Sequence, residues 1–142
     1  MNNDILKILI SQDEIKEKVK ELGQLITKDY KDKDLMVIGI LKGCIVFLSD
    51  LIREINLPLT MDFMVVSSYG SSTKSSGVVR IVKDLEKDIA GKDILIVEDI
   101  VDTGLTLSYL VEYLKSRNAS SVKICTLLEK PDRRKAEVDL EY

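Results

Sequence analysis

The stretch that decides the fold reads Ile94-Leu95-Ile96-Val97-Glu98-Asp99-Ile100-Val101-Asp102-Thr103-Gly104-Leu105-Thr106. Four apolar residues followed by two carboxylates predict a buried parallel strand that runs out to the carboxyl edge of a sheet. Ligands of open α/β sheets bind at that edge. A helix that opens at Thr103 to Thr106 presents backbone N–H groups and a dipole that favour a phosphate. Acids able to bind hydroxyls or a metal thus stand beside a phosphate site, which suits a phosphorylated sugar.

Working outward from this stretch, strands alternate with helices along the chain. Ser11 and Glu14 have the spacing of a capping box and open a helix that runs to about Tyr30. Alternating strands and helices imply a parallel sheet with right-handed crossovers. The pair of strands at 60–67 and 78–83 is expected to form an antiparallel flap around a polar loop, 68–77. Further strands are expected at 5–10, 35–41, 122–128 and from 138 onward, and further helices at 44–55 and 105–117.

Size and composition describe one globular domain and exclude several chemistries. The 142 residues are 45% hydrophobic and 32% charged, and the net charge of −3 argues against nucleic acid as a partner. The chain contains no histidine, so histidine bases, histidine metal sites and Ser-His-Asp triads are excluded. Any metal must be a hard ion with oxygen ligands, such as magnesium. Cys44 and Cys125 lie in separate apolar runs and are expected to be buried thiols. No apolar run reaches membrane-spanning length.

The segment Val97 to Thr106 resembles the phosphoribosyl-pyrophosphate (PRPP) motif of the type I phosphoribosyltransferases. That motif is a strand, two acids, two apolar residues and then Asp-Thr-Gly-x-Thr, and this sequence matches it throughout. Acids are common at strand ends, so Glu98 and Asp99 alone would also fit a plain acidic edge. The resemblance implies an α/β fold of the type I phosphoribosyltransferase class: a mainly parallel central sheet flanked by helices, with an antiparallel flap hairpin and an incomplete hood.

Three further segments follow the order of the hypoxanthine–guanine branch of that family. Leu41-Lys42-Gly43 resembles its pyrophosphate loop, in which the peptide before the lysine can be cis, although Lys-Gly after a strand is also a common turn. Ser68-Tyr69 resembles the start of its flexible loop, which closes over the transition state; a plain hairpin tip is the alternative. Lys130 follows the expected strand at 122–128 and resembles the lysine that donates to the purine O6 atom in that branch. The alternative is that it lies in a plain solvated turn.

The resemblance implies transfer of the 5-phosphoribosyl group from PRPP to hypoxanthine or guanine, giving IMP or GMP and pyrophosphate, in purine salvage. Asp102 would accept the purine N7 proton, although it would serve equally as a helix cap. The implied enzyme is cytoplasmic, uses Mg²⁺, forms a dimer or tetramer and binds neither nucleic acid nor membrane. The implied roles are catalysis for Asp102; ribose and metal for Glu98 and Asp99; 5′-phosphate for Asp102, Thr103, Gly104, Leu105 and Thr106; pyrophosphate for Leu41, Lys42 and Gly43; flexible loop for Ser68 and Tyr69; and purine for Lys130.

Residues 1–142 are expected to form a single phosphoribosyltransferase domain. Family members usually continue past the position that matches Tyr142, into a segment with an aromatic for purine stacking and further pyrophosphate and metal ligands, so the base half of the site is expected to be incomplete here. Two alternatives remain for the function. One is a non-catalytic regulator on the same fold that senses PRPP or a nucleotide; the other is a phosphoribosyltransferase for a different nucleobase.

Overall fold

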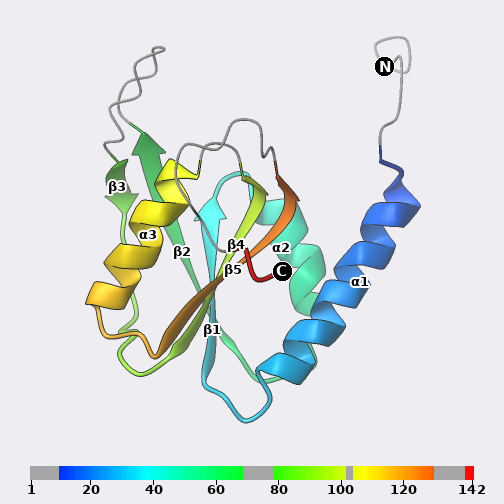
Figure 1. Cartoon of the computed structure of the whole chain (residues 1–142), viewed down its shortest axis with the longest axis horizontal. Coiled ribbons are helices and arrows are strands. Elements are labelled where there is room, and N and C mark those ends of the chain that lie inside the picture. Colours follow the sequence, from blue (N-terminus) through cyan, green and yellow to red (C-terminus); the bar gives the residue numbers. More distant parts are fainter. Residues whose placement is uncertain (1–9, 69–78, 102–103, 130–139) are drawn as a thin grey trace.

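The computed structural model describes residues 10–68, 79–101, 104–129 and 140–142. These ranges contain three helices and five strands in an α/β arrangement (Figure 1). None of the described helices combines the length and apolar content needed to cross a bilayer. The elements, in chain order, are α1 (Gln12–Asp29), β1 (Leu35–Leu41), α2 (Ile45–Arg53), β2 (Thr60–Ser68), β3 (Val79–Lys83), β4 (Asp93–Val101), α3 (Leu105–Ser116) and β5 (Ser121–Glu129).

The five strands form one sheet in the order β3-β2-β1-β4-β5. Strands β2, β1, β4 and β5 are parallel, and β3 pairs antiparallel with β2. The carboxyl ends of the four parallel strands therefore meet at one edge. The sequence predicted this mainly parallel sheet and its antiparallel hairpin, and the structure confirms both.

Helices cover both faces of the sheet, as Figure 1 shows: α1 and α2 lie on one face and α3 on the other. Strand β1 is the centre of the fold, and every residue from Leu35 to Ile40 is buried, as its apolar run predicted. Its odd and even positions divide between two apolar cores. Leu35 and Val37 pack with α1 and α2, whereas Met36 and Ile38 pack with α3.

Helix α1 begins where the capping box predicted. The backbone N–H of Glu14 donates to the Ser11 hydroxyl at 3.1 Å, and that hydroxyl lies 3.2 Å from the Glu14 carboxylate. The buried positions Val19, Leu22 and Ile26 recur at helical spacing and face the sheet side. This local signal was sufficient to place the helix because the cap and the apolar stripe are both contained in its own sequence.

Strand β4 is longer than the sequence predicted. The expected strand ended with the two carboxylates, but β4 continues to Val101 because β5 pairs with it as far as Val101↔Glu129. On its other side, β4 pairs with β1 only as far as Gly39↔Val97. Glu98 and Asp99 therefore lie beyond the end of the β1 ladder while still held in extended backbone by β5.

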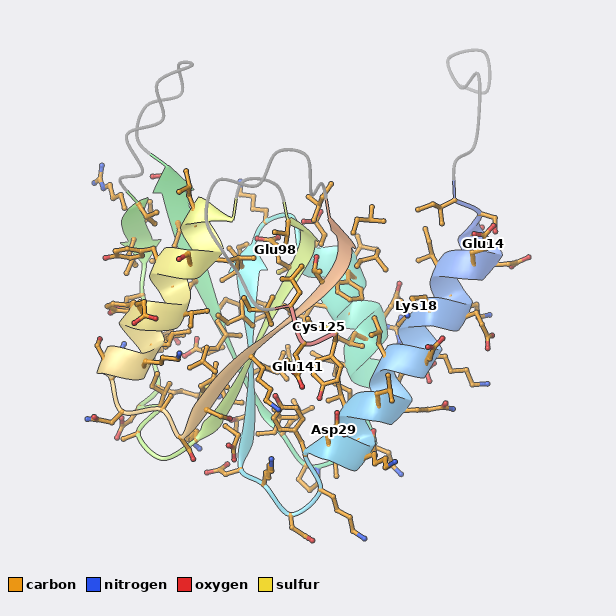
Figure 2. The ribbon with its side chains drawn as sticks, viewed as in Figure 1. Glu14, Lys18, Asp29, Glu98, Cys125 and Glu141 are labelled. Atoms are coloured by element: carbon orange, nitrogen blue, oxygen red, sulfur yellow. The ribbon has the colours of Figure 1, made fainter. Side chains whose placement is uncertain are left out.

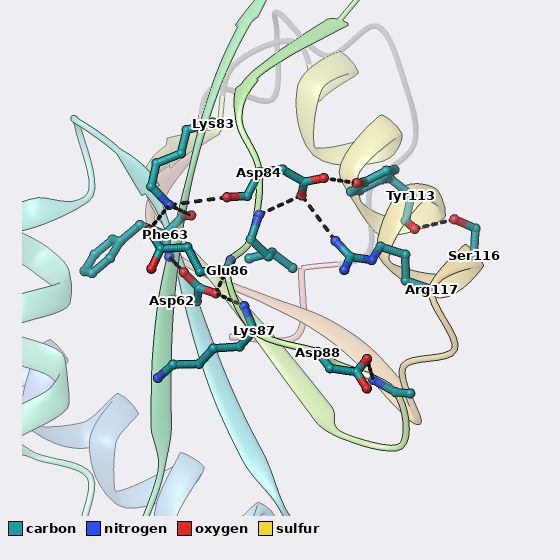
Figure 3. Close-up of polar contacts among 12 residues, drawn as sticks. Asp62, Phe63, Lys83, Asp84, Glu86, Lys87, Asp88, Tyr113, Ser116 and Arg117 are labelled. Atoms are coloured by element: carbon teal, nitrogen blue, oxygen red, sulfur yellow. Dashed lines mark hydrogen bonds and ion pairs between the residues drawn. The ribbon is translucent and has the colours of Figure 1, made fainter.

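The hairpin of β2 and β3 is fastened at its base by a buried carboxylate. Asp62, on β2, is only 6% exposed. Its Oδ1 accepts the N–H of Phe63 at 2.8 Å, and its Oδ2 accepts the N–H groups of Glu86 and Lys87 at 2.9 and 3.1 Å (Figure 3). Burial alone would raise the pKa of Asp62, but the three N–H donors and the nearby Lys83 ammonium outweigh burial and lower it.

An Asp62→Asn variant will lose about 1–3 kcal/mol of stability at pH 7, because an amide NH₂ would face backbone N–H donors and leave them unpaired. A carboxylate whose pKa is lowered by folding stabilises above its unfolded pKa of about 3.9 and loses that contribution as pH falls through the folded value. Urea unfolding measured between pH 3 and pH 7 should therefore show that the difference in unfolding free energy between wild type and variant becomes smaller toward pH 3. The exposed Asp32→Asn variant is the control. An equal loss of unfolding free energy for both substitutions would contradict the role of Asp62 at the base of the hairpin.

The last described residues run beside β5. The N–H groups of Glu141 and Tyr142 donate to the carbonyl of Ile124, and the Tyr142 hydroxyl donates to Asp29 at 2.6 Å. Residues 140–142 thus occupy the place of the further strand that was expected from 138 onward, although they carry no strand geometry. The expected strand at 5–10 and the expected polar loop at 68–77 lie almost wholly outside the described residues.

Candidate functional site

The carboxyl edge of the sheet collects several of the residues that the sequence singled out. Strand β1 ends at Leu41 and leads into Lys42 and Gly43, and β4 carries Glu98 and Asp99 near its end. Helix α3 begins at Leu105, with Gly104 as its N-cap residue. Figure 2 shows Glu98 at this end of the sheet, with Asp29 at the opposite end of the molecule.

The Leu41–Lys42 peptide is cis. It joins the end of β1 to the turn that starts α2, where the N–H of Ile45 donates to the carbonyl of Lys42 at 3.2 Å. The Lys42 side chain is exposed. An exposed ammonium at this edge is free to meet a phosphate as a point charge.

Asp99 packs directly against the turn that follows β1. A Cβ added at Gly43 would lie 3.1 Å from Asp99 Oδ1 and 3.3 Å from Oδ2. The same carboxylate accepts the backbone N–H of Ile100 at 2.8 Å. The absence of a side chain at Gly43 therefore sets how closely the acid and the loop approach each other.

A Gly43→Ala variant will force the Asp99 carboxylate or the loop to move by a few tenths of an ångström. The sequence resemblance implies that this edge binds PRPP. In that role, the ratio kcat/KM for PRPP is expected to fall by about 10- to 100-fold, because small misplacements of binding groups are costly in transfer reactions. Steady-state kinetics with varied PRPP measures this.

Gly91→Ala is the matched control. Gly91 has φ +78° and lies before β4, at the far end of the sheet, with no atom within 4 Å of an added Cβ. This variant should lose about 1–2 kcal/mol of stability through backbone strain and keep its kcat/KM. Equal kinetic losses in the two variants would contradict a special role for Gly43.

Although successive side chains of a strand leave on opposite faces, the Glu98 carboxylate still contacts the Asp99 side chain at the end of β4. It lines a cavity of about 240 Å³ between the ends of β1, β2 and β4 and the start of α3, together with Leu41, Gly104 and Thr106. The backbone N–H of Asp99 donates to Glu98 Oε1 at 3.1 Å. Burial, joined by the hydrogen-bonding contact with Asp99 and its charge, raises the pKa of Glu98 to about 8.

The start of α3 has the properties of an anion site. Gly104 is the N-cap residue, with φ +81°, a left-handed conformation that favours glycine. Gly104 itself has no side chain that could cap the helix, and the first turn of α3 contains no acidic residue. The N-terminal dipole therefore faces the cavity through Gly104 and Thr106 without a competing carboxylate from its own first turn.

The carboxylates at this edge suit a magnesium ion that is shared with a substrate. Over the described ranges, no three His, Cys, Asp or Glu side chains gather in one place. Two hard oxygen donors, Glu98 and Asp99, are nevertheless adjacent at the edge. Mg²⁺ is commonly bound by one or two carboxylates plus substrate phosphates and water, so this donor set fits the ion.

Several predicted site residues lie outside the described residues: Asp102, Thr103, Tyr69 and Lys130. Ser68 is the last residue of β2. Sequence reasoning missed Asp62 as an anchor of the hairpin, although a lone carboxylate in an otherwise apolar strand was a signal. Of the two carboxylates predicted at the end of this strand, Glu98 lines the cavity beside α3 and Asp99 packs on the turn before α2.

Known proteins with similar sequences and structures cover the whole chain. Residues 11–142 match the family model "Phosphoribosyl transferase domain". The hypoxanthine-guanine phosphoribosyltransferase of Bacillus subtilis (strain 168) is 56% identical over all 142 residues, which correspond to 79% of its length. A crystal structure of a hypoxanthine phosphoribosyltransferase from Staphylococcus aureus superposes with a TM-score of 0.95 at 49% identity, covering 100% of this chain and 77% of that one.

A third similar structure is a Trypanosoma cruzi hypoxanthine phosphoribosyl transferase, studied for the role of its C-terminal region in oligomeric state and enzymatic activity. It has a TM-score of 0.88 and 40% identity, with 96% of this chain and 75% of that chain covered. These matches agree with the sequence motif, the strand order and the geometry of the sheet edge, which all indicate the same family. The chain therefore belongs to the phosphoribosyltransferase family and has the type I phosphoribosyltransferase fold.

Proposed function

We propose that this protein is a purine-salvage enzyme that transfers the 5-phosphoribosyl group from PRPP to hypoxanthine or guanine, forming IMP or GMP and pyrophosphate. The observation that carries the proposal is the meeting, at one sheet edge, of the Lys42 turn, the Glu98–Asp99 pair and the start of α3 with its N-cap residue Gly104. Relatives at about half identity that are named for this activity support it.

The proposed reaction breaks the bond between C1′ and the pyrophosphate oxygen and forms a bond between C1′ and the purine nitrogen. The start of α3 would bind the 5′-phosphate, Glu98 and Asp99 the ribose hydroxyls, and Lys42 the pyrophosphate. With both ends of PRPP fixed, C1′ can gain oxocarbenium character opposite a positioned base. Asp102 would accept the purine N7 proton, and Lys130 would donate to the O6 atom.

We further propose that Glu98 and Asp99 share a magnesium ion with PRPP. When bound, the ion would neutralise charge on the pyrophosphate leaving group. The carboxylates themselves would hold the ribose hydroxyls, directly or through that ion. The half-buried position of Glu98 would strengthen each polar contact that it makes to the sugar.

A single phosphoribosyltransferase domain, 1–142, is the proposed organisation, and a dimer or tetramer is the proposed assembly. Cys44 and Cys125 are free and buried, which is in keeping with a reducing, cytoplasmic location.

The test is an assay with PRPP, magnesium and one nucleobase at a time, in which the nucleotide product is separated and identified. The proposal expects product with hypoxanthine or guanine and little with adenine, uracil or orotate. Product with only one of those three bases would reassign the enzyme to that base. PRPP binding without product from any base would instead favour a regulator that senses PRPP.

A further inference from the structure

The chain that leaves β3 is connected to α3 by one carboxylate. Asp84 follows β3 directly, and it accepts a hydrogen bond from the Tyr113 hydroxyl near the end of α3 (Figure 3). Arg117, one turn further along, places its guanidinium 3.3 Å from Asp84 Oδ1. Asp84 Oδ1 also accepts the N–H of Leu85 at 2.7 Å, so the carboxylate is held in a fixed orientation.

The Tyr113 side chain is itself well oriented. Its ring stacks on Tyr109, with centroids 6.3 Å apart and an angle of 7° between the planes. The Arg117 guanidinium lies 5.9 Å from the Tyr113 ring centroid. A ring fixed on both sides can direct its hydroxyl only toward a narrow region, and Asp84 occupies that region.

The segment that carries Asp84 is rigid on its other side as well. Lys83 Nζ donates to the carbonyls of Phe63 and Asp84, both at 3.3 Å. Asp62 binds the N–H groups of Glu86 and Lys87, as described above. The chain from Lys83 to Lys87 is thus attached to β2 on one side and to α3 on the other.

The buried side chains of helix α3 that face the sheet are apolar. Leu107, Leu110 and Leu114 are buried in the core that it shares with β1 and β4. Apolar burial is not directional. It therefore resists removal of the helix from the sheet more than it resists sliding of the helix along its axis or rotation about that axis. Directional hydrogen bonds to a fixed point on the sheet suppress such movement.

We infer that Asp84 and Tyr113 are positioning residues, which hold the start of α3 in register with the sheet edge so that it can bind the 5′-phosphate. The inference rests on the proposed function, since it assigns the start of α3 to a sugar phosphate. Tyr113 is nine residues beyond Gly104, about 14 Å along the helix. Its hydroxyl therefore acts on the ligand only through the placement of α3.

The test compares Tyr113→Phe with Tyr109→Phe. Both remove one hydroxyl from the same helix. Tyr109 is the matched control, because it is 42% exposed and its hydroxyl makes no hydrogen bond within the described residues. Titration calorimetry with ribose 5-phosphate should show about a five- to tenfold weaker affinity for Tyr113→Phe and wild-type affinity for Tyr109→Phe. Combining Asp84→Ala with Tyr113→Phe should weaken the affinity for ribose 5-phosphate no further than Asp84→Ala alone. Asp84→Glu should keep part of the affinity that Asp84→Ala loses.

The KM for PRPP should rise in parallel with the weaker ribose 5-phosphate affinity, while kcat changes less. A lower melting temperature with unchanged affinity would mean that Tyr113 is merely structural, and it would overturn the inference. Equal effects of both tyrosine variants, or no binding of ribose 5-phosphate by the wild type, would overturn it too. If the wild type binds ribose 5-phosphate but forms no nucleotide, the proposed function fails, and the affinities of the two variants still decide the inference.

Discussion

Replacing Asp102 by asparagine is expected to lower the turnover number by about two to four orders of magnitude, the usual contribution of a general acid–base group. Asp102 stands in the sequence between Glu98–Asp99, the pair proposed to bind ribose, and the helix start proposed to bind phosphate, and an amide in its place has the same shape but accepts no proton. Single-turnover kinetics with saturating PRPP and hypoxanthine measures the chemical step directly.

The affinity of Asp102→Asn for PRPP should stay close to that of the wild type, because the proposed partner of Asp102 is the base. The exposed Asp32→Asn variant carries the same change of chemistry and controls for charge. Wild-type turnover in Asp102→Asn would contradict the proposed role. A large loss of PRPP affinity with unchanged turnover would instead assign Asp102 to the phosphate-binding helix start as a cap.

A double variant, Glu98→Gln with Asp99→Asn, is expected to lose at least about a hundredfold in magnesium-dependent PRPP affinity. Each carboxylate would make charge-assisted hydrogen bonds worth about 1.5–3 kcal/mol, and the two lie on either side of the same strand end. The protein should remain folded, because both side chains lie beyond the β1 ladder and neither belongs to the two apolar cores. Calorimetry with PRPP, with and without magnesium, is the measurement.

The pair Glu21→Gln with Asp32→Asn is the control for that double variant. It removes the same two charges from exposed positions of α1 and of the turn that follows it. Wild-type PRPP binding by the Glu98–Asp99 double variant would remove these residues from the site. A drop in magnesium dependence alone, with affinity retained in the absence of the ion, would assign them to the metal rather than to the ribose.

Much of the fold was readable because its signals are local. The Ser11–Glu14 cap, the apolar run of β1 and the motif that ends in Thr106 each lie within a dozen residues, and all three elements appear where they were predicted. The extra length of β4 was not readable, because it depends on pairing with β5, about 28 residues further along the chain. Local alternation cannot show how far a neighbouring strand will continue.

The long-range polar contacts of Asp62 and Asp84 could not be predicted from the sequence either. Asp62 meets backbone N–H groups 24 and 25 residues away, and Asp84 meets Tyr113 at a separation of 29 residues. Such partners become neighbours only after the sheet and α3 have packed. The division of Glu98 and Asp99 between two faces follows from period-two alternation, once β4 is known to continue through them.

The most direct test of the account is a crystal structure of this protein with IMP bound. We expect the 5′-phosphate to lie at the start of α3, against Gly104 and Thr106. The ribose hydroxyls should point toward Glu98 and Asp99, and the purine O6 should lie within reach of Lys130. A nucleotide bound with its phosphate away from α3, or with the sugar turned away from both carboxylates, would contradict the assignment of this sheet edge as the site of phosphoribosyl transfer.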